Sequence, residues 1–390
     1  MLTPEYLDKL PNHVVNTLLN LEDEIIADIA RRISENLQLT ETAEYQIEML
    51  YRMNYDIEQI EKKIAKAMNI SEKKLEEILK EAAETSYENE RLIYKKGGKI
   101  LPPIDNNPRI IDFIEATIRQ TRGTFRNLTN TAGFVSGNQF MEASEFYRNT
   151  LDFAVWELGT GAFDYNTVLR KAVKALGDSG IRTIDYESGR RYHIESAARM
   201  TILTGTSQIT GYMSEFNADL MGQDLMQITA HFDARPSHAV WQGQVVSRSG
   251  RRGYLSLEDI GYGEADGFKG VNCRHDWYPY FEGISSPLPP VSYPEPFTYK
   301  GKTYDAYQAS QRQRYMERQI RKTKRQIIAY ENAGLKEEAI DAQIKLFRQR
   351  QEYERFSSEA GLRAKHERTH TYGYGRSQSM RAVWAVRKAH

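Results

Sequence analysis

The side chains best suited to chemistry are concentrated between His231 and Pro279, in the segments HFDARPSHAVWQG and GVNCRHDWYP. This stretch contains the single cysteine of the chain, Cys273, and three of its eight histidines. Imidazole and thiolate groups bind metal ions, histidine also moves protons, and arginine binds phosphate. We therefore expect this stretch either to carry out chemistry or to hold part of the fold together.

One hypothesis for the stretch is a metal site. In an extended segment, Cys273 and His275 point to one side while Arg274 points to the other. Zinc binds Cys and His in a tetrahedral set, and the HFDARPSH segment would complete it. The candidates there are His231, Asp233 and His238, and the ligand set we select is His238, Cys273 and His275. However, a Cys-x-His pair some 35 residues from its partner segment matches no common zinc-finger spacing.

A second hypothesis gives His231, His238 and His275 acid and base roles, as in a metal-free ribonuclease. Arg235 or Arg274 would then hold a phosphate. The third hypothesis, which we favour, is a buried polar core that holds the glycine-rich loop GYGEADGFKG against the strand after His238. Its members would be His231, Asp233, Arg235, His238, Arg274 and His275. We assign no catalytic residue, and we expect no cofactor unless the cluster binds zinc.

Length and composition limit the class of protein. The chain has 390 residues, enough for two or three domains that each bury a core. One cysteine forms no internal disulfide, so no oxidising compartment is needed. No stretch approaches the roughly 18 consecutive apolar residues of a membrane helix, and MLTPEYLDKL lacks a signal-peptide pattern. We expect assembly in a cytoplasm and no membrane partner.

The net charge is zero, but the charges are separated along the chain. Residues 1–90 have 20 Asp/Glu and 10 Lys/Arg, whereas residues 311–328 have seven Lys/Arg and one Glu, and residues 362–390 repeat that balance. This asymmetry suggests an acidic end that meets proteins and a basic end that meets nucleic acid. The DNA-facing candidates are Arg318, Arg321, Lys322, Lys324 and Arg325. The alternative is that each run is a solvated helix face.

The elements around these residues are mostly helical. Thr3 followed by Pro4 is a helix start, and Ser71 is a candidate N-cap of a further helix with an apolar stripe. The stripe consists of Leu75, Ile78, Leu79 and Ala82. Glycine, proline and asparagine between Lys95 and Pro108 end this helical region. Asn332-Ala333-Gly334 separates two further apolar stripes, which predicts an antiparallel helix pair.

These patterns predict an α+β fold that is predominantly helical, with helical ends flanking a small α+β domain of short strands and glycine-rich loops. Within that domain, IRTIDY has the composition of a strand followed by a turn. The predicted regions are an acidic helical hairpin or bundle (1–95), a linker and helical block (96–178), the small α+β domain (179–298), a basic helix pair (299–369) and a flexible basic tail (370–390).

Six motifs, in this order, resemble the phage minor capsid protein 2 family, which is related to the Mu F-like head morphogenesis proteins. They are KGGKILPPIDNNPRI, IDYESGRRYHIESAARM, HFDARPSHAVWQG, the GYG loop, GVNCRHDWYPY and YQASQRQRYMERQIRKTKRQI. A shared order of long motifs is far more specific than any one of them. The resemblance covers nearly the whole chain. It implies a low-copy structural protein of tailed-phage heads that is associated with the portal vertex, and in some relatives contact with DNA or entry into the host with it.

We therefore predict a minor structural protein of the virion that acts in head assembly and in DNA packaging or ejection, and not an enzyme. The resemblance implies association with the portal vertex, and we expect the portal protein, the major capsid or scaffold protein, and phage DNA as partners. Two alternatives remain from the residues themselves. One is a nuclease-like enzyme carried in the virion and delivered to the host, and the other is a nucleic-acid-binding module.

Overall fold

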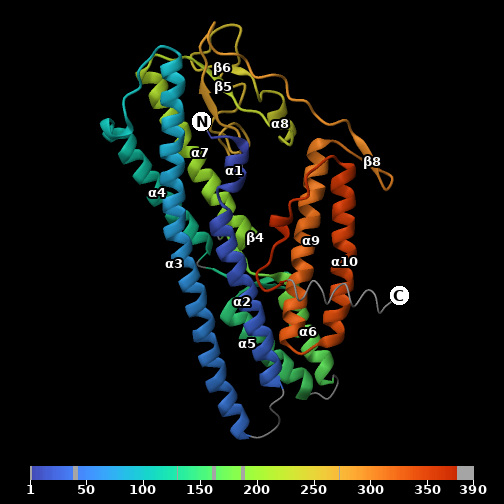
Figure 1. Ribbon diagram of the computed structural model, residues 1–390. Coiled ribbons are helices and arrows are strands. Elements are labelled where there is room, and N and C mark those ends of the chain that lie inside the picture. Colours follow the sequence, from blue (N-terminus) through green and yellow to red (C-terminus); the bar gives the residue numbers. More distant parts are fainter. Residues whose placement is uncertain are drawn as a thin grey trace.

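Helices form most of the molecule (Figure 1). The structure, a computed structural model, describes residues 2–37, 43–129, 131–159, 164–185, 189–271 and 273–375. The α-helices are α1 (Pro4–Lys9), α2 (Asn12–Leu37), α3 (Ala43–Lys96), α4 (Pro108–Thr129), α5 (Ala143–Gly159), α6 (Tyr165–Ser179), α7 (Ile194–Leu220), α8 (Pro236–Ala239), α9 (Ala306–Asn332) and α10 (Lys336–Glu359). Short antiparallel sheets accompany them. The predicted fold class, α+β and predominantly helical, is confirmed. Within the described ranges, no helix combines the length and apolar character needed to cross a bilayer.

In the N-terminal region, α2 and α3 form a helical hairpin. The Thr3 side chain caps α1 by accepting from the Tyr6 N–H at 3.2 Å, which confirms the Thr3-Pro4 start. Ser71 is not an N-cap, because α3 continues through it for 54 residues, or about 80 Å at the rise of an α-helix. No glycine or proline interrupts this helix, and Ser71 lies on its buried face. Figure 1 shows α2 and α3 side by side along the long axis of the molecule.

The break after α3 is confirmed, whereas the block that follows is less helical than predicted. α3 ends at Lys96, and Gly98 adopts a left-handed φ of 76°. Within the predicted helical block, β1 (Gly133–Ser136) and β2 (Gln139–Glu142) form a hairpin around a turn in which Gly137 has a φ of 58°. Two short apolar runs separated by Gly-Asn are a hairpin signal, and this signal was missed.

This hairpin belongs to a four-stranded antiparallel sheet in the order β2-β1-β3-β4. β3 (Arg182–Ile184) confirms the strand predicted in IRTIDY, and it pairs with β4 (Arg191–His193) directly before α7. The sheet packs beside α5, α6 and α7 and joins the large core formed by the long helices.

A second, three-stranded sheet has a core of its own. Its order is β6-β5-β7, from β6 (Val245–Ser247), β5 (Leu225–Ile228) and β7 (Trp277–Pro279). Together with α8 and the loops between these strands it forms what we call the β5–β7 unit. The unit's core consists of Met226, Ile228, Trp241, Val246, Ile260, Phe268, Cys273 and Trp277, and Ala218 of α7 packs with it. In Figure 1 the unit lies at one end of the molecule, near the N-terminus, and the backbone N–H of Leu2 donates to Asp276 Oδ2 at 2.9 Å.

The glycines of the loop GYGEADGFKG serve two different purposes. Gly261 and Gly263 have φ values of 56° and 80°, which only glycine adopts readily. Gly267 and Gly270 instead allow close backbone contact, because a Cβ at Gly267 would lie 1.9 Å from the carbonyl oxygen of Gly261.

In the C-terminal region, α9 and α10 form an antiparallel helix pair. The hairpin of β8 (Phe297–Tyr299) and β9 (Lys302–Tyr304) leads into α9, which begins with a capping box made by Asp305 and Gln308. α9 ends at Asn332, Gly334 has a φ of 77°, and α10 runs back along α9. Of the predicted flexible tail, residues 370–375 are packed, with Tyr374 buried and the Gly373 N–H bound to Asp23 at 3.0 Å. Residues 376–390 lie outside the described ranges.

The acidic and basic regions that are far apart in the sequence meet in the fold. Arg325 of α9 contacts Glu22 of α2 at 3.1 Å, and both side chains are buried. Asp8 of α1 binds Arg368 at 2.5 Å and Lys365 at 3.4 Å. One continuous apolar core also joins α2 to α10. The charge separation seen in the sequence is therefore partly neutralised inside the molecule.

Candidate functional site

The histidine and cysteine cluster is assembled by the pairing of β5 with β7. In their antiparallel register Ile228, at the end of β5, lies opposite Trp277, at the start of β7. The segment that leaves β5 and the segment that enters β7 therefore lie at the same end of the paired strands. His238 is on α8, shortly after β5, and Cys273 and His275 lie just before β7. These three residues are the ligand set expected from the sequence, and the fold brings them together.

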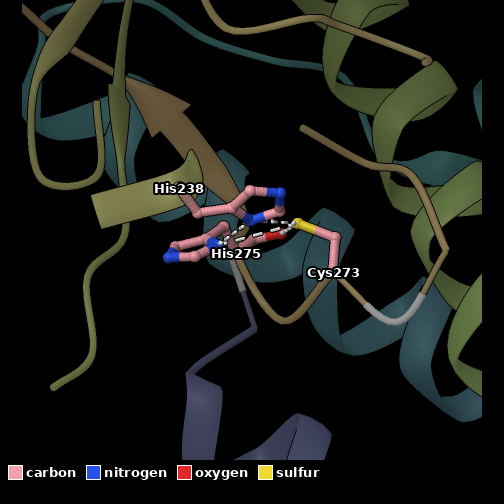
Figure 2. Close-up of side chains that lie close together, drawn as sticks. All are labelled: His238, Cys273 and His275. Atoms are coloured by element: carbon pink, nitrogen blue, oxygen red, sulfur yellow. Dashed lines mark hydrogen bonds between the residues drawn. The ribbon is translucent and has the colours of Figure 1, made fainter. Parts of the chain in front are cut away.

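The three side chains converge on a common point (Figure 2). His238 Nδ1 is 3.3 Å from His275 Nδ1, and Cys273 Sγ is 3.9 Å and 3.7 Å from these two nitrogens. Only 2–4% of each residue is exposed. Among the residues that the structure describes, they are the one group of His, Cys, Asp or Glu in a metal-binding arrangement. The predicted alternation holds, because Arg274 points away to Asp233.

Hydrogen bonds determine which nitrogen of each imidazole carries a hydrogen. His238 Nε2 is 2.8 Å from the backbone carbonyl of Asp266, which only accepts, so Nε2 donates. His275 Nε2 is 3.0 Å from Gln242 Oε1. That atom also accepts from the backbone N–H of His231 at 3.0 Å, so it is the amide oxygen and His275 Nε2 donates to it. Both neutral rings therefore present an unprotonated Nδ1 to each other.

Burial keeps these groups in their neutral forms. It lowers the pKa of His238 to about 4 and holds the pKa of His275 well below its usual value, where the neighbouring histidines and arginines lower it further. Burial also raises the pKa of the Cys273 thiol. At neutral pH and without a bound cation, the cluster is an uncharged group of two imidazoles and a thiol.

The other predicted members form a second layer beside this cluster. The His231 ring stacks on His275 with centroids 4.5 Å apart, and its Nδ1 is 2.9 Å from Asp233. Asp233 also contacts Arg274 at 2.8 Å and Arg314 of α9 at 3.7 Å. Burial opposes ionisation of Asp233, but His231 and Arg274 outweigh it, so the pKa of this carboxyl lies far below its usual value. This layer connects the β5–β7 unit to α9.

The arginines proposed to hold phosphate have protein partners. Arg235 donates to the backbone carbonyl of Val271 at 2.7 Å, and Arg274 is bound to Asp233. A cavity of about 260 Å³ next to Asp233 is lined by further cationic side chains. They are Arg314, Arg363, Lys365 and Arg368.

The five DNA-facing candidates on α9 have very different surroundings. Arg318 is exposed, and Lys322 is partly exposed and contacts Asp178 at 3.3 Å. Arg321 donates to Glu195 at 3.1 Å in a mostly buried pair. Lys324 and Arg325 are buried and bind the Thr369 carbonyl and Glu22. With this packing, the last two side chains are out of reach of a DNA backbone.

Gln242 and Asp266, which orient the two imidazoles, were not among the residues expected from the sequence. Gln242 follows His238 by four residues, and its backbone N–H bonds to the His238 carbonyl at 3.0 Å, so local spacing gave one hint. Asp266 contributes a backbone carbonyl from the glycine-rich loop, which no side-chain pattern reveals. That contact agrees with the favoured hypothesis, in which the cluster holds this loop in place.

Comparisons with known proteins give a consistent result. The family model for phage minor capsid protein 2 matches residues 2–357. A protein named "Structural protein" of Lactococcus phage LL-H is 30% identical over 164 residues, which are 39% of this chain and 41% of that protein. A "Structural protein" of Lactococcus phage mv4 is 37% identical over 87 residues, 21% of this chain and 61% of that protein. The matched regions thus cover less than two thirds of either relative. No solved structure shows a significant match.

Proposed function

The chain belongs to the phage minor capsid protein 2 family, and we propose that within the virion it lies at the portal vertex and acts in head assembly and in DNA packaging or ejection. The match of the family model to residues 2–357 supports the proposal and confirms the resemblance seen in the motifs. The chain is a phage structural protein, and virion proteins act by contacting one another. Its proposed partners are the portal protein and the major capsid or scaffold protein, with assembly in the host cytoplasm.

The α2–α3 hairpin is the part we assign to protein contacts. It is long, and α3 exposes apolar side chains at well-separated points along its length, among them Tyr55, Ile70 and Leu92. Single exposed apolar residues are common on monomers, so their value here is as positions for a cross-linking test. Several acidic side chains of this region are used inside the molecule, and those that remain exposed include Glu58 and Glu77.

The proposal also includes contact with DNA, and the surface available for that contact is smaller than the sequence suggested. Since Lys324 and Arg325 are buried, Arg318 is the exposed member of the original set. Its neighbours Arg312 and Tyr315 form a cation–π contact on the same helix. We assign this side of α9 to phage DNA.

The test uses virions that carry a photocrosslinking residue in place of Tyr55 on α3, with Tyr315 on α9 as the matched control position. Both tyrosines are exposed. Mass spectrometry of purified virions should find the protein, and the position 55 product should contain portal, capsid or scaffold protein. The position 315 product should lack these proteins. Absence of the protein from virions, or identical products from both positions, would contradict the proposal.

The nuclease-like alternative requires histidines that reach a substrate and exchange protons. His238 and His275 are almost fully buried, with both Nε2 atoms bound inside the protein. Geometry thus favours the structural role over acid–base catalysis. Purified protein incubated with RNA or DNA should show no cleavage. Cleavage that disappears in His238→Gln, while the fold measured by circular dichroism is kept, would reverse this conclusion.

A further inference from the structure

The spacing of the three convergent ligand atoms agrees with that around a tetrahedral metal ion. With Zn–N near 2.05 Å and Zn–S near 2.3 Å, tetrahedral geometry places two nitrogens about 3.3 Å apart and a nitrogen and a sulfur about 3.6 Å apart. The distances here are 3.3 Å between His238 Nδ1 and His275 Nδ1, and 3.7 Å and 3.9 Å from these to Cys273 Sγ. From this geometry we propose that His238, Cys273 and His275 bind one zinc ion.

The hydrogen-bond network independently points to a cation between the two imidazoles. Because Asp266 and Gln242 accept from the Nε2 atoms, both Nδ1 lone pairs face each other at 3.3 Å. Two lone pairs at this distance repel, and a metal ion between them converts the repulsion into two bonds. Metal-binding histidines commonly donate their other N–H to a carbonyl or amide oxygen, as both do here.

The donor set selects the kind of metal. Two imidazoles and a thiolate suit zinc, whereas magnesium and calcium prefer oxygen ligands. Zinc binding releases the Cys273 proton, because the thiolate and not the thiol is the ligand. The centroid of the Trp241 ring lies 4.5 Å and 4.9 Å from the ring centroids of His238 and His275, so an aromatic side chain would line the site beside the metal. Among the described residues no fourth His, Cys, Asp or Glu joins the group, so the proposal gives the fourth position to water.

The ion would join two segments that have little secondary structure of their own. His238 follows β5, Cys273 and His275 precede β7, and the glycine-rich loop touches the site through Asp266. Zinc there holds the segment after β5 to the segment before β7, much as a disulfide would in an oxidising compartment. This role goes beyond the proposed function at the portal vertex and does not depend on it.

The first test measures bound metal in the purified full-length chain. After loading with zinc and dialysis against metal-free buffer, elemental analysis should find about one zinc per chain. Cys273→Ser and His238→Gln should each lower this content by at least tenfold. His231→Gln is the matched control, because His231 stacks on His275 but directs its Nδ1 to Asp233, so it should retain the zinc. The proposal would be overturned if the unmodified chain held no zinc after loading and dialysis, or if Cys273→Ser kept its full zinc content.

The second test needs no substitution and therefore remains decisive if the variants fail to fold. The unmodified chain is stripped with a chelator and refilled with Co²⁺, which should give the visible bands of tetrahedral cobalt and a thiolate-to-cobalt charge-transfer band. The thermal midpoint of the stripped protein should be lower than before and should return with zinc but not with magnesium. A spectrum of octahedral cobalt without the charge-transfer band would exclude Cys273 as a ligand.

Discussion

The buried pair of Glu22 and Arg325 gives a sharp test of how the two ends of the chain are joined. Glu22 accepts from Arg325 at 3.1 Å and from the Ile181 N–H at 2.8 Å, and neither side chain of the pair is more than 3% exposed. Removing one partner of a buried pair costs about 3–5 kcal/mol. Burial raises the pKa of Glu22 while Arg325 lowers it, so without Arg325 this carboxyl protonates and the loss is smaller. We expect Arg325→Ala to lower the free energy of unfolding by about 3 kcal/mol, the lower end of that range.

The matched control is Arg318→Ala on the same helix. Arg318 is exposed, so its removal should change the free energy of unfolding by less than about 0.5 kcal/mol. Both are measured by urea unfolding followed by circular dichroism at pH 7. The double variant Glu22→Gln/Arg325→Met keeps an acceptor for Ile181 and a side chain of similar volume, so it should regain most of the stability.

DNA affinity should depend on Arg318 and not on Arg325, which is the reverse of the order expected for stability. In urea-free buffer, where both variants are folded, Arg318→Ala should weaken salt-dependent DNA binding and Arg325→Ala should not. Equal stability of the two single variants would refute the reasoning about the buried pair. A loss of DNA affinity in folded Arg325→Ala would refute its assignment to the interior.

Three further outcomes are expected from the structure. Burial lowers the pKa of His193 to about 3, and nearby arginines lower it further, whereas Glu195 opposes the shift. Because the unfolded chain binds a proton at this histidine and the folded chain does not, stability falls as the pH decreases from about 6.5 toward 3. His193→Gln should flatten that part of an acid-unfolding curve. Burial raises the pKa of Asp23 from 3.8 to about 7, so its carboxyl contributes stability at low pH that is lost as the pH rises from about 4 to 7. Thermal unfolding of Asp23→Asn should therefore be less sensitive to pH in that interval. Gly267→Ala forces a Cβ against Gly261 and should destabilise by about 1–3 kcal/mol in urea unfolding, whereas Gly123→Ala, in an exposed and open part of α4, should stabilise by about 0.5–1 kcal/mol.

Features determined by neighbouring residues could be predicted from the sequence. The start at Thr3-Pro4, the end of α3 near Gly98 and the turn at Gly334 each depend on the conformational limits of one or two residues. Ser71 shows where such local evidence fails. A serine can cap a helix or lie within one, and here Ser71 is fully buried within α3, whose apolar face belongs to the large core.

The long-range consequences of charge could not be predicted in the same way. The basic run on α9 had the composition of a DNA-binding surface, yet Arg325 pairs with a residue 303 positions earlier in the chain. Composition cannot distinguish an exposed cation from one with a buried partner, since both occur in a basic run. The same limit applies to the cluster, where the residue types were identified but the acceptors that orient the imidazoles were not.

A zinc ion in the cluster would act on stability and not on a substrate, although three protein ligands and a water are also the pattern of catalytic zinc sites. Catalysis needs a path by which a substrate reaches the open position. Here His238 and His275 are 2% exposed, Trp241 packs against both rings, and His231 stacks on His275. Chelation should therefore increase hydrogen exchange in β5, β7 and the glycine-rich loop and leave α2 and α3 unchanged. Equal increases in both regions would mean that the ion stabilises the whole molecule instead of the β5–β7 unit.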